Sequence, residues 1–151
     1  MSMIYRRATA ADIEGMFRVR FAVQENKLSD PSLVTHEICR QMIEERGAGW
    51  VCEVGGEAVG FAIVDLSKAN IWALFIEPAY ERKGIGRKLH DEMVAWAFGK
   101  GLRKLWLGTD PGTRAEGFYR KAGWRAIGKE ANGEIKFELE KHNFTPVQEP
   151  G

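Results

Sequence analysis

The sequence predicts an α/β (α+β) fold in which helices pack against a single sheet. Its 151 residues match one compact domain, and 44% are apolar, enough for a core without disulfide or metal staples. Apolar stretches typical of strands alternate with stretches whose apolar residues recur every three or four positions. Because no repeat, low-complexity segment or linker divides the chain, we expect one domain over residues 1–140 and a loose tail over 141–151.

The first part of the chain predicts a strand followed by two helices. A short strand over 4–8 leads to Thr9, which resembles a helix N-cap. Asp12, three positions later, completes an acidic variant of the capping box, and the helix that follows should end near residue 26. A second helix is expected from about residue 35 to 45, where apolar residues again recur at helical spacing.

The rest of the chain predicts a hairpin and then alternating helices and strands. Gly55-Gly56 lies between the apolar runs 50–54 and 58–66, which indicates a two-residue hairpin turn. The run 71–76 is apolar throughout, which suits a strand buried on both faces. The remaining elements are a helix over 85–100, a strand over 105–108, a helix containing 115–122, and strands over 124–127 and 135–139.

Composition and charge argue against several kinds of partner. Lys plus Arg is 22 and Asp plus Glu is 21, so the chain lacks the basic excess of a nucleic-acid-binding protein. Cys39, Cys52 and His90 have no neighbours at metal-ligand spacing, so we expect no metal, two reduced thiols and a structural histidine. The N-terminus has no signal-peptide pattern, and the run 71–76 is too short to span a bilayer. We therefore expect a cytoplasmic protein without a nucleic-acid or membrane partner.

A glycine-rich turn over 81–87 joins the buried strand to the helix after it. Helix N-termini present unpaired N–H groups and a partial positive charge, and Gly84 and Gly86 let an anion approach the backbone with no Cβ in the way. Arg82, Lys83 and Arg87 add positive charge. The turn predicts a phosphate or pyrophosphate site. Alone, the segment favours a tight turn with solvated cations over a ligand site, and it matches neither the dinucleotide fingerprint nor the P-loop.

Two segments in order resemble the GNAT superfamily of N-acetyltransferases. The strand, Pro78 and Glu81-Arg82-Lys83-Gly84-Ile85-Gly86 are similar to the family pattern Gln/Arg-x-x-Gly-x-Gly/Ala. About thirty residues later, Phe118-Tyr119-Arg120-Lys121-Ala122-Gly123-Trp124 resembles the family's Tyr-x-Lys-x-Gly-Phe. The order of elements fits nearly the whole chain. The resemblance implies a mixed, mostly antiparallel sheet of about six or seven strands flanked by about four helices.

The resemblance implies acetyl-CoA as the co-substrate. The family's pyrophosphate-binding amides fall on Arg82, Lys83, Gly84, Ile85, Gly86 and Arg87. The strand residues that hydrogen-bond the pantetheine arm fall on Phe75 and Ile76. One position departs from the family pattern, because Glu81 stands where the family has Gln or Arg and places an acid beside the expected polyanion.

The resemblance also implies direct attack by a primary amine on acetyl-CoA, with Tyr119 as the general acid. A phenol with a pKa of about 10 can protonate a thiolate whose conjugate acid has a pKa near 8.5. On spacing alone, Tyr119 would instead be a core aromatic. The family's Asn before this helix falls on Gly112, so that polar contact must come from elsewhere, such as Thr109 or Thr113.

The acceptor and the general base stay open at this stage. Glu25, Asp65 and Glu77 are candidates, each also readable as a solvated surface acid, and a water chain could replace them. In the family the acceptor enters beside the segment over 24–35, and both a small-molecule and a peptide amine fit. A homodimer follows from family analogy only. The alternatives are a catalytically silent acyl-CoA-binding module and a regulatory module that binds another phosphate ligand.

Overall fold

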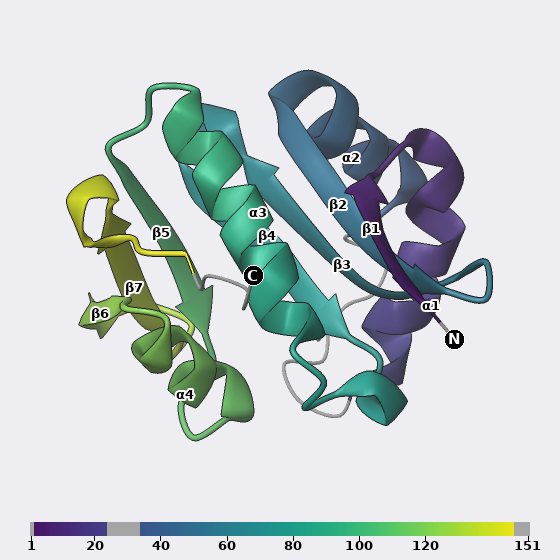
Figure 1. Cartoon of the computed structure of the whole chain (residues 1–151). Helices are drawn as coiled ribbons and strands as arrows, with labels where there is room; N and C mark the ends of the chain where they lie inside the picture. Colours follow the sequence, from purple (N-terminus) through teal and green to yellow (C-terminus); the bar gives the residue numbers. More distant parts are fainter. Residues whose placement is uncertain (1, 24–33, 147–151) are drawn as a thin grey trace.

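The computed structural model describes residues 2–23 and 34–146 and contains one seven-stranded sheet of order β1-β2-β3-β4-β5-β7-β6 (Figure 1). All neighbouring strands are antiparallel except β4 and β5, so the expected α/β class with a mixed, mostly antiparallel sheet is confirmed. The strands are β1 Met3–Arg7, β2 Gly47–Val54, β3 Glu57–Asp65, β4 Asn70–Ile76, β5 Lys104–Thr109, β6 Arg125–Lys129 and β7 Ile135–Glu140. The α-helices of the described residues are α1 Ile13–Ala22, α2 His36–Gln41, α3 Ile85–Gly99 and α4 Arg114–Lys121.

Alternating residues of the central strands face two separate cores. In β3, Ala62 and Val64 belong to the core under α3, whereas Phe61 and Ile63 belong to the core under α1 and α2. Because successive side chains of a strand point to opposite faces, this division places α3 on one side of the sheet and α1 and α2 on the other (Figure 1). The sheet centre is therefore buried on both faces.

The two cysteines lie in different cores and form no disulfide. Cys39 belongs to the core under α1 and α2, and Cys52 belongs to the core under α3. Burial raises the pKa of both thiols above the usual value, because a buried thiolate is poorly solvated. Both cysteines therefore act as small apolar core residues.

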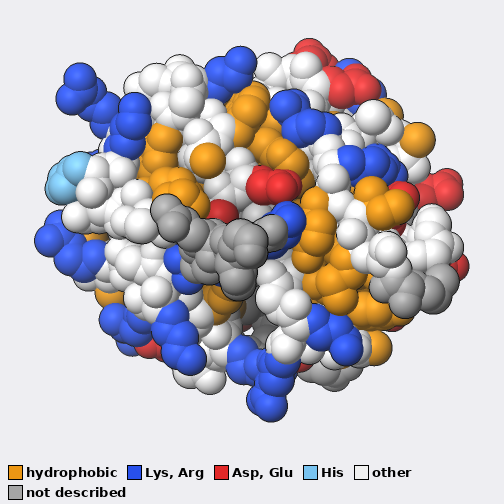
Figure 2. All heavy atoms as spheres, viewed as in Figure 1, with side chains coloured by type: hydrophobic (Ala, Val, Ile, Leu, Met, Phe, Trp, Pro, Cys, Tyr) orange, Lys and Arg blue, Asp and Glu red, His pale blue; other side chains and the backbone are white. Residues whose placement is uncertain are grey.

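The surface of the described residues carries mixed charge. In the view of Figure 2, Lys and Arg side chains are scattered among acids and apolar groups and do not form one continuous basic stripe. Within residues 2–23 and 34–146, no helix has the length and apolarity needed to cross a bilayer. In the same residues, no group of three His, Cys, Asp or Glu side chains could hold a metal ion.

The β2–β3 hairpin is longer than its apolar runs predict. The first apolar run of the hairpin begins at residue 50, but β2 begins at Gly47, which pairs with Asp65. The helical segment before it ends in a π-helical turn over Met42–Arg46. Small residues at the start of β2 carry no strand signal in the sequence, and Gly47 is required there because its Cα lies against the β3 backbone.

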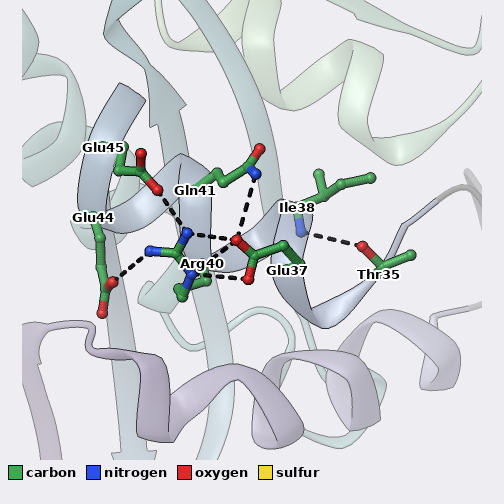
Figure 3. A network of polar contacts seen from close by, with 7 residues as sticks. All are labelled: Thr35, Glu37, Ile38, Arg40, Gln41, Glu44 and Glu45. Atoms are coloured by element: carbon green, nitrogen blue, oxygen red, sulfur yellow. Dashed lines mark hydrogen bonds and ion pairs between the residues drawn. The ribbon is translucent and has the colours of Figure 1, made fainter.

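A network of charged side chains holds α2 and the π-helical turn together (Figure 3). Thr35 caps α2 by accepting a hydrogen bond from a backbone N–H of the first turn. The Arg40 guanidinium forms ion pairs with Glu37 at 2.5 Å, Glu44 at 3.0 Å and Glu45 at 2.6 Å. Individual exposed pairs contribute little, but one guanidinium shared by three carboxylates fixes the orientation of this segment.

The strands β4 and β5 run parallel but pair at one point only, Asn70 with Trp106. Beyond that point they diverge (Figure 1), while β4 stays paired with β3 through Ile76. A bulge accompanies the divergence: Val64 pairs with Ile71 and Ile63 with Ala73, which leaves Trp72 between them without a partner. The edge of β4 that faces β5 is therefore unpaired over its second half.

Replacing Gly47 by alanine is expected to destabilise the fold. A Cβ at this position would lie 1.7 Å from the carbonyl oxygen of Val64, so the β2–β3 pairing would have to shift. We expect the free energy of unfolding to fall by about 2 kcal/mol or more. Gly99→Ala is the matched control, because no atom of the described residues lies within 4 Å of a Cβ there. Thermal denaturation checks both variants, and an unchanged Tm for Gly47→Ala would contradict the prediction.

Candidate functional site

The glycine turn connects β4 to α3, as predicted from the sequence. Pro78–Tyr80 forms a 3-10 turn after β4, and Gly84 is the N-cap of α3 with φ +82°. Arg82 has φ +62°, a left-handed conformation that is uncommon for a residue with a Cβ. Two positive φ angles, at positions 82 and 84, set the direction in which the first amides of α3 point.

A cavity of about 640 Å³ lies over this turn, and we call it the turn cavity. Its walls come from the end of β4, the turn, the start of α3, and α4. All the cofactor residues predicted from the sequence line it except Lys83. The lining includes Leu74, Phe75, Ile76, Tyr80, Glu81, Arg82, Gly84, Ile85, Gly86, Arg87, Arg114, Ala115, Phe118 and Tyr119.

A second cavity, of about 520 Å³, lies between the diverging strands, and we call it the splay cavity. It is lined by Arg20 of α1, by 71–75 of β4, by 107–110 at the end of β5, and by two residues before β7, Asn132 and Glu134. Four residues line both cavities: Leu74, Phe75, Ala115 and Tyr119. The two cavities therefore meet at the edge of β4 that β5 leaves unpaired.

Tyr119 lies where the cavities meet. Its side chain is buried, with 7% of the residue exposed, and its ring packs on Phe118, Trp124 and Phe137. Burial raises the pKa of Tyr119 well above its usual value, because the phenolate would be poorly solvated. The hydroxyl has no hydrogen-bond partner among the described residues. Tyr119 is therefore both the core aromatic that its spacing predicts and a protonated donor that faces two cavities.

A chain of hydrogen bonds links the turn to the core beside Tyr119. The Trp124 indole N–H donates to His90 Nε2 at 2.9 Å, and an indole nitrogen can only donate. His90 therefore carries its proton on Nδ1 and donates it to Asp91 Oδ1 at 2.7 Å. The same Asp91 oxygen accepts from Arg87 Nε at 3.0 Å. The expected structural role of His90 is to connect Arg87 of the turn with Trp124 of the aromatic cluster.

The segment after β7 also contacts this cluster. The ring of Phe144 lies 6.4 Å from His90 and 5.9 Å from Phe98, measured between ring centres. Lys141–Asn143 forms a 3-10 turn that brings Phe144 back to α3. The domain boundary after residue 140 remains a prediction, but Phe144 beyond it is part of the core packing.

Glu81, the departure from the family pattern, forms an ion pair with Arg114 of α4. Both residues line the turn cavity. The negative charge that the sequence placed beside the expected anion site is thus compensated by a cation 33 positions later in the chain. The pair also bridges the turn to the helix that carries Tyr119, a contact that local sequence patterns cannot indicate.

Of the predicted substrate acids that the structure describes, neither Asp65 nor Glu77 lines either cavity. Asp65 lies opposite Asn70, at the far end of β4, where it pairs with Arg46 and accepts hydrogen bonds from Ser67. These bonds give Asp65 a structural role at the end of the β2–β3 hairpin. Glu77 follows β4 but lines neither cavity, and its N–H donates to β3. Glu25 falls outside the described residues.

Two threonines and a glycine considered from the sequence for this polar contact can also be placed. Thr109 lines the splay cavity and is buried, whereas Thr113 caps α4 by accepting from the N–H of Glu116. Gly112, where the family has Asn, has φ +76° and donates its N–H to Glu116. Of the two threonines considered from the sequence, Thr109 is therefore the one beside the cavity.

Sequence reasoning missed the cation of the splay cavity. In the sequence, Arg20 lies within the first predicted helix and belongs to no motif. In the structure its guanidinium carbon lies 4.0 Å from the ring centre of Phe75, and burial lowers the pKa of Arg20 below its usual value. Its Nη1 atom is buried without a hydrogen-bond partner among the described residues. No sequence signal distinguishes it from the exposed Arg18 two positions earlier.

The sheet with its central divergence and glycine turn defines a protein of the acetyltransferase class. Residues 13–124 match the model of the acetyltransferase (GNAT) family, and the chain belongs to that family. An uncharacterized N-acetyltransferase of Methanocaldococcus jannaschii, MJ1207, is 31% identical over 86 residues. That match covers 50% of this chain and 38% of the relative, so the chain spans well under two thirds of that protein's length.

Solved structures of the family share the fold. The PaiA N-acetyltransferase of Thermoplasma acidophilum in complex with coenzyme A has a TM-score of 0.77 at 17% identity, covering 93% of this chain and 99% of that one. The ribosomal-protein-S18-alanine N-acetyltransferase of Escherichia coli has a TM-score of 0.74 at 16% identity, and the match covers 92% of this chain and 94% of that one. A GNAT acetyltransferase of Staphylococcus aureus Mu50 has a TM-score of 0.80 at 16% identity, and the match covers 92% of this chain and 99% of that one. At these identities the similarity shows the fold alone.

Trp124→Phe is expected to destabilise the protein by about 1–3 kcal/mol, because it leaves His90 Nε2 buried without a donor. Trp106→Phe is the matched control: that indole N–H donates to the backbone carbonyl of Lys68 at an exposed site, where water can replace it. Urea denaturation of both variants measures the difference. Equal losses of unfolding free energy in the two variants would contradict the prediction that the buried bond to His90 contributes more than the exposed bond to Lys68.

Proposed function

We propose that this protein is an acetyl-CoA-dependent N-acetyltransferase that binds CoA in the turn cavity and a primary amine in the splay cavity. The observation that carries the proposal is that the two cavities share the wall formed by Leu74, Phe75, Ala115 and Tyr119. Direct transfer requires the amine to reach the thioester carbon, so donor and acceptor sites must meet. They meet here where the edge of β4 is unpaired.

The turn cavity has the properties that CoA requires. At one end, the N-terminus of the 15-residue helix α3 lies beside Arg82 and Arg87, a favourable place for a pyrophosphate. Apolar side chains of β4 line the part nearer Tyr119 and suit a pantetheine arm. The N–H of Glu77 points to β3, so strand alternation directs the N–H of Ile76 toward the gap, where it can donate to a ligand.

Gly86 supplies a further argument for a ligand at the turn. It lies in the first turn of α3, where its φ does not require glycine. A Cβ there would meet Ile76 and Phe118 at 3.6–3.9 Å, which is ordinary van der Waals contact. Alanine would also favour the helix. Since nothing in the fold of the described residues demands glycine, the space that it leaves in the cavity wall is best explained by a ligand that approaches the backbone.

Tyr119 is the residue to which we assign proton donation. When bound, acetyl-CoA supplies the acetyl group, and its sulfur leaves as a thiolate that needs a proton. Burial keeps the Tyr119 hydroxyl protonated at neutral pH, and the residue lines both cavities. The alternative, a silent acyl-CoA-binding module, needs the turn cavity alone. The second cavity that meets it at Tyr119 favours an enzyme.

Thermal shift with CoA tests the ligand. We expect CoA at a hundred times its Kd to stabilise the wild type by about 2.7 kcal/mol and ATP to do so far less. Gly86→Ala should fold with an equal or higher Tm, because alanine suits a helix, yet lose most of the CoA-induced shift. Gly99→Ala, at the other end of α3, should keep it. If ATP stabilises the protein and CoA does not, the proposed function is wrong.

Replacing Tyr119 by phenylalanine should preserve the CoA-induced shift and lower kcat by roughly a hundredfold, the range of general acid catalysis. Tyr80→Phe is the control, because Tyr80 lines the turn cavity alone. Burial raises the pKa of Tyr119, so wild-type activity should show no loss from tyrosine ionisation up to about pH 10. Release of free thiol over a panel of amines gives the rates. Unchanged turnover in Tyr119→Phe removes the assignment.

A further inference from the structure

The geometry points to a small amino carboxylate as the acceptor, with its carboxylate bound by Arg20 in the splay cavity. This inference rests on the proposed function and names the substrate class of the same site. An acceptor of this class carries its amine and its carboxylate a few bonds apart, as a free amino acid does. It differs from a peptide N-terminus, in which an amide replaces the carboxylate.

Arg20 is placed like a ligand-binding residue. It lines the splay cavity, its Nη1 is buried, and no group of the described residues hydrogen-bonds that nitrogen. A buried unpaired donor is unfavourable, and more so when it is charged. The contact with Phe75 stabilises the charge but uses the face of the guanidinium and satisfies none of its N–H donors. A carboxylate in the cavity would satisfy them, because a guanidinium binds carboxylates in a two-pronged geometry.

The position of Arg20 sets the distance between carboxylate and amine. The guanidinium carbon lies 4.0 Å from the centre of the Phe75 ring, and Phe75 lines both cavities. An anion held by Arg20 therefore lies next to the wall where acetyl transfer would occur. The acceptor amine must reach that wall, so only a short spacer between the amine and the carboxylate fits.

The remaining charges of the splay cavity argue for a single negative charge on the acceptor. Among the described residues that line it, Arg20 is the one Lys or Arg, and the acids Asp110 and Glu134 line it too. One cation matches an acceptor with one carboxylate, and the two acids disfavour any second negative group on it. A doubly charged phosphate would meet one cation and two like charges, which is unfavourable.

Matched pairs of acceptors test the inference. The kcat/KM of L-lysine, L-methionine and L-phenylalanine is compared with that of each carboxamide, and a hexapeptide that begins with alanine represents a peptide N-terminus. The amine beside a neutral amide has a lower pKa, near 8, so more of it is unprotonated at pH 7.5. Chemistry alone therefore favours the amides and the peptide. We expect the opposite for the wild type, with kcat/KM at least about tenfold higher for the acids.

Arg20→Met should remove this preference mainly by raising KM for the acids, with kcat little changed, and Arg20→Lys should keep part of it. Arg18→Met is the matched control on α1, because Arg18 donates to the Ala58 carbonyl and lines neither cavity. In the presence of CoA, the acids should raise the Tm of the wild type but not that of Arg20→Met. The shift produced by CoA itself should be equal in both.

The outcomes separate the two proposals. Equal use of acids and amides, preference for the peptide, an unaltered preference in Arg20→Met, or no acid-dependent rise in Tm would each overturn the amino carboxylate. In all those cases CoA binding and transfer to amides or peptide would leave the acetyltransferase proposal standing. Loss of the CoA shift, or no thiol release with any amine, would instead count against the proposed function itself.

Discussion

The single point of pairing between β4 and β5 is the constraint on which the site depends. A sheet normally satisfies its backbone groups strand by strand, and unpaired edges occur at its borders. Here Asn70 and Trp106 pair, β4 remains attached to β3, and β5 remains attached to β7. The unpaired edge therefore opens inside the sheet, between two strands whose positions are otherwise fixed. Both cavities depend on that opening, because both are lined by the second half of β4.

The parts of the site are joined by contacts that span the opening. Glu81 of the turn pairs with Arg114 of α4, so the element before α3 and the helix that carries Tyr119 are held to each other. Under the surface, a chain of hydrogen bonds makes a second connection between the turn and the aromatic cluster around Tyr119. It runs from Arg87 through Asp91 and His90 to Trp124. Both ring nitrogens of the fully buried His90 are bonded. The turn and the aromatic cluster around Tyr119 are therefore joined through the core as well as at the surface.

Much of the fold was predictable because its signals are local. Apolar alternation, Gly55-Gly56 and the turn over 81–87 each act within a few residues, and the structure follows them to within a few positions. The turn likewise indicated most of the turn cavity. The pairing of Asp65 with Arg46 has no local pattern because the two residues lie far apart in the chain. Arg20 was missed because burial of a single nitrogen has no local pattern either. Glu81 looked unfavourable for the same reason, since the charge that compensates it lies on another helix.

The two cavities are not independent, because Phe75 is a wall of both. The Arg20 guanidinium lies over the Phe75 ring, and Phe75 also lines the turn cavity. A ligand that orders Phe75 from the turn side therefore also fixes the platform on which the guanidinium rests. The cost of holding an unpaired guanidinium nitrogen away from water is then offset in part by the aromatic contact before any acceptor arrives. An acceptor anchored through that guanidinium would be positioned relative to the donor by the Phe75 ring. A site can in this way fix the distance between two substrates without contacting the bond that forms.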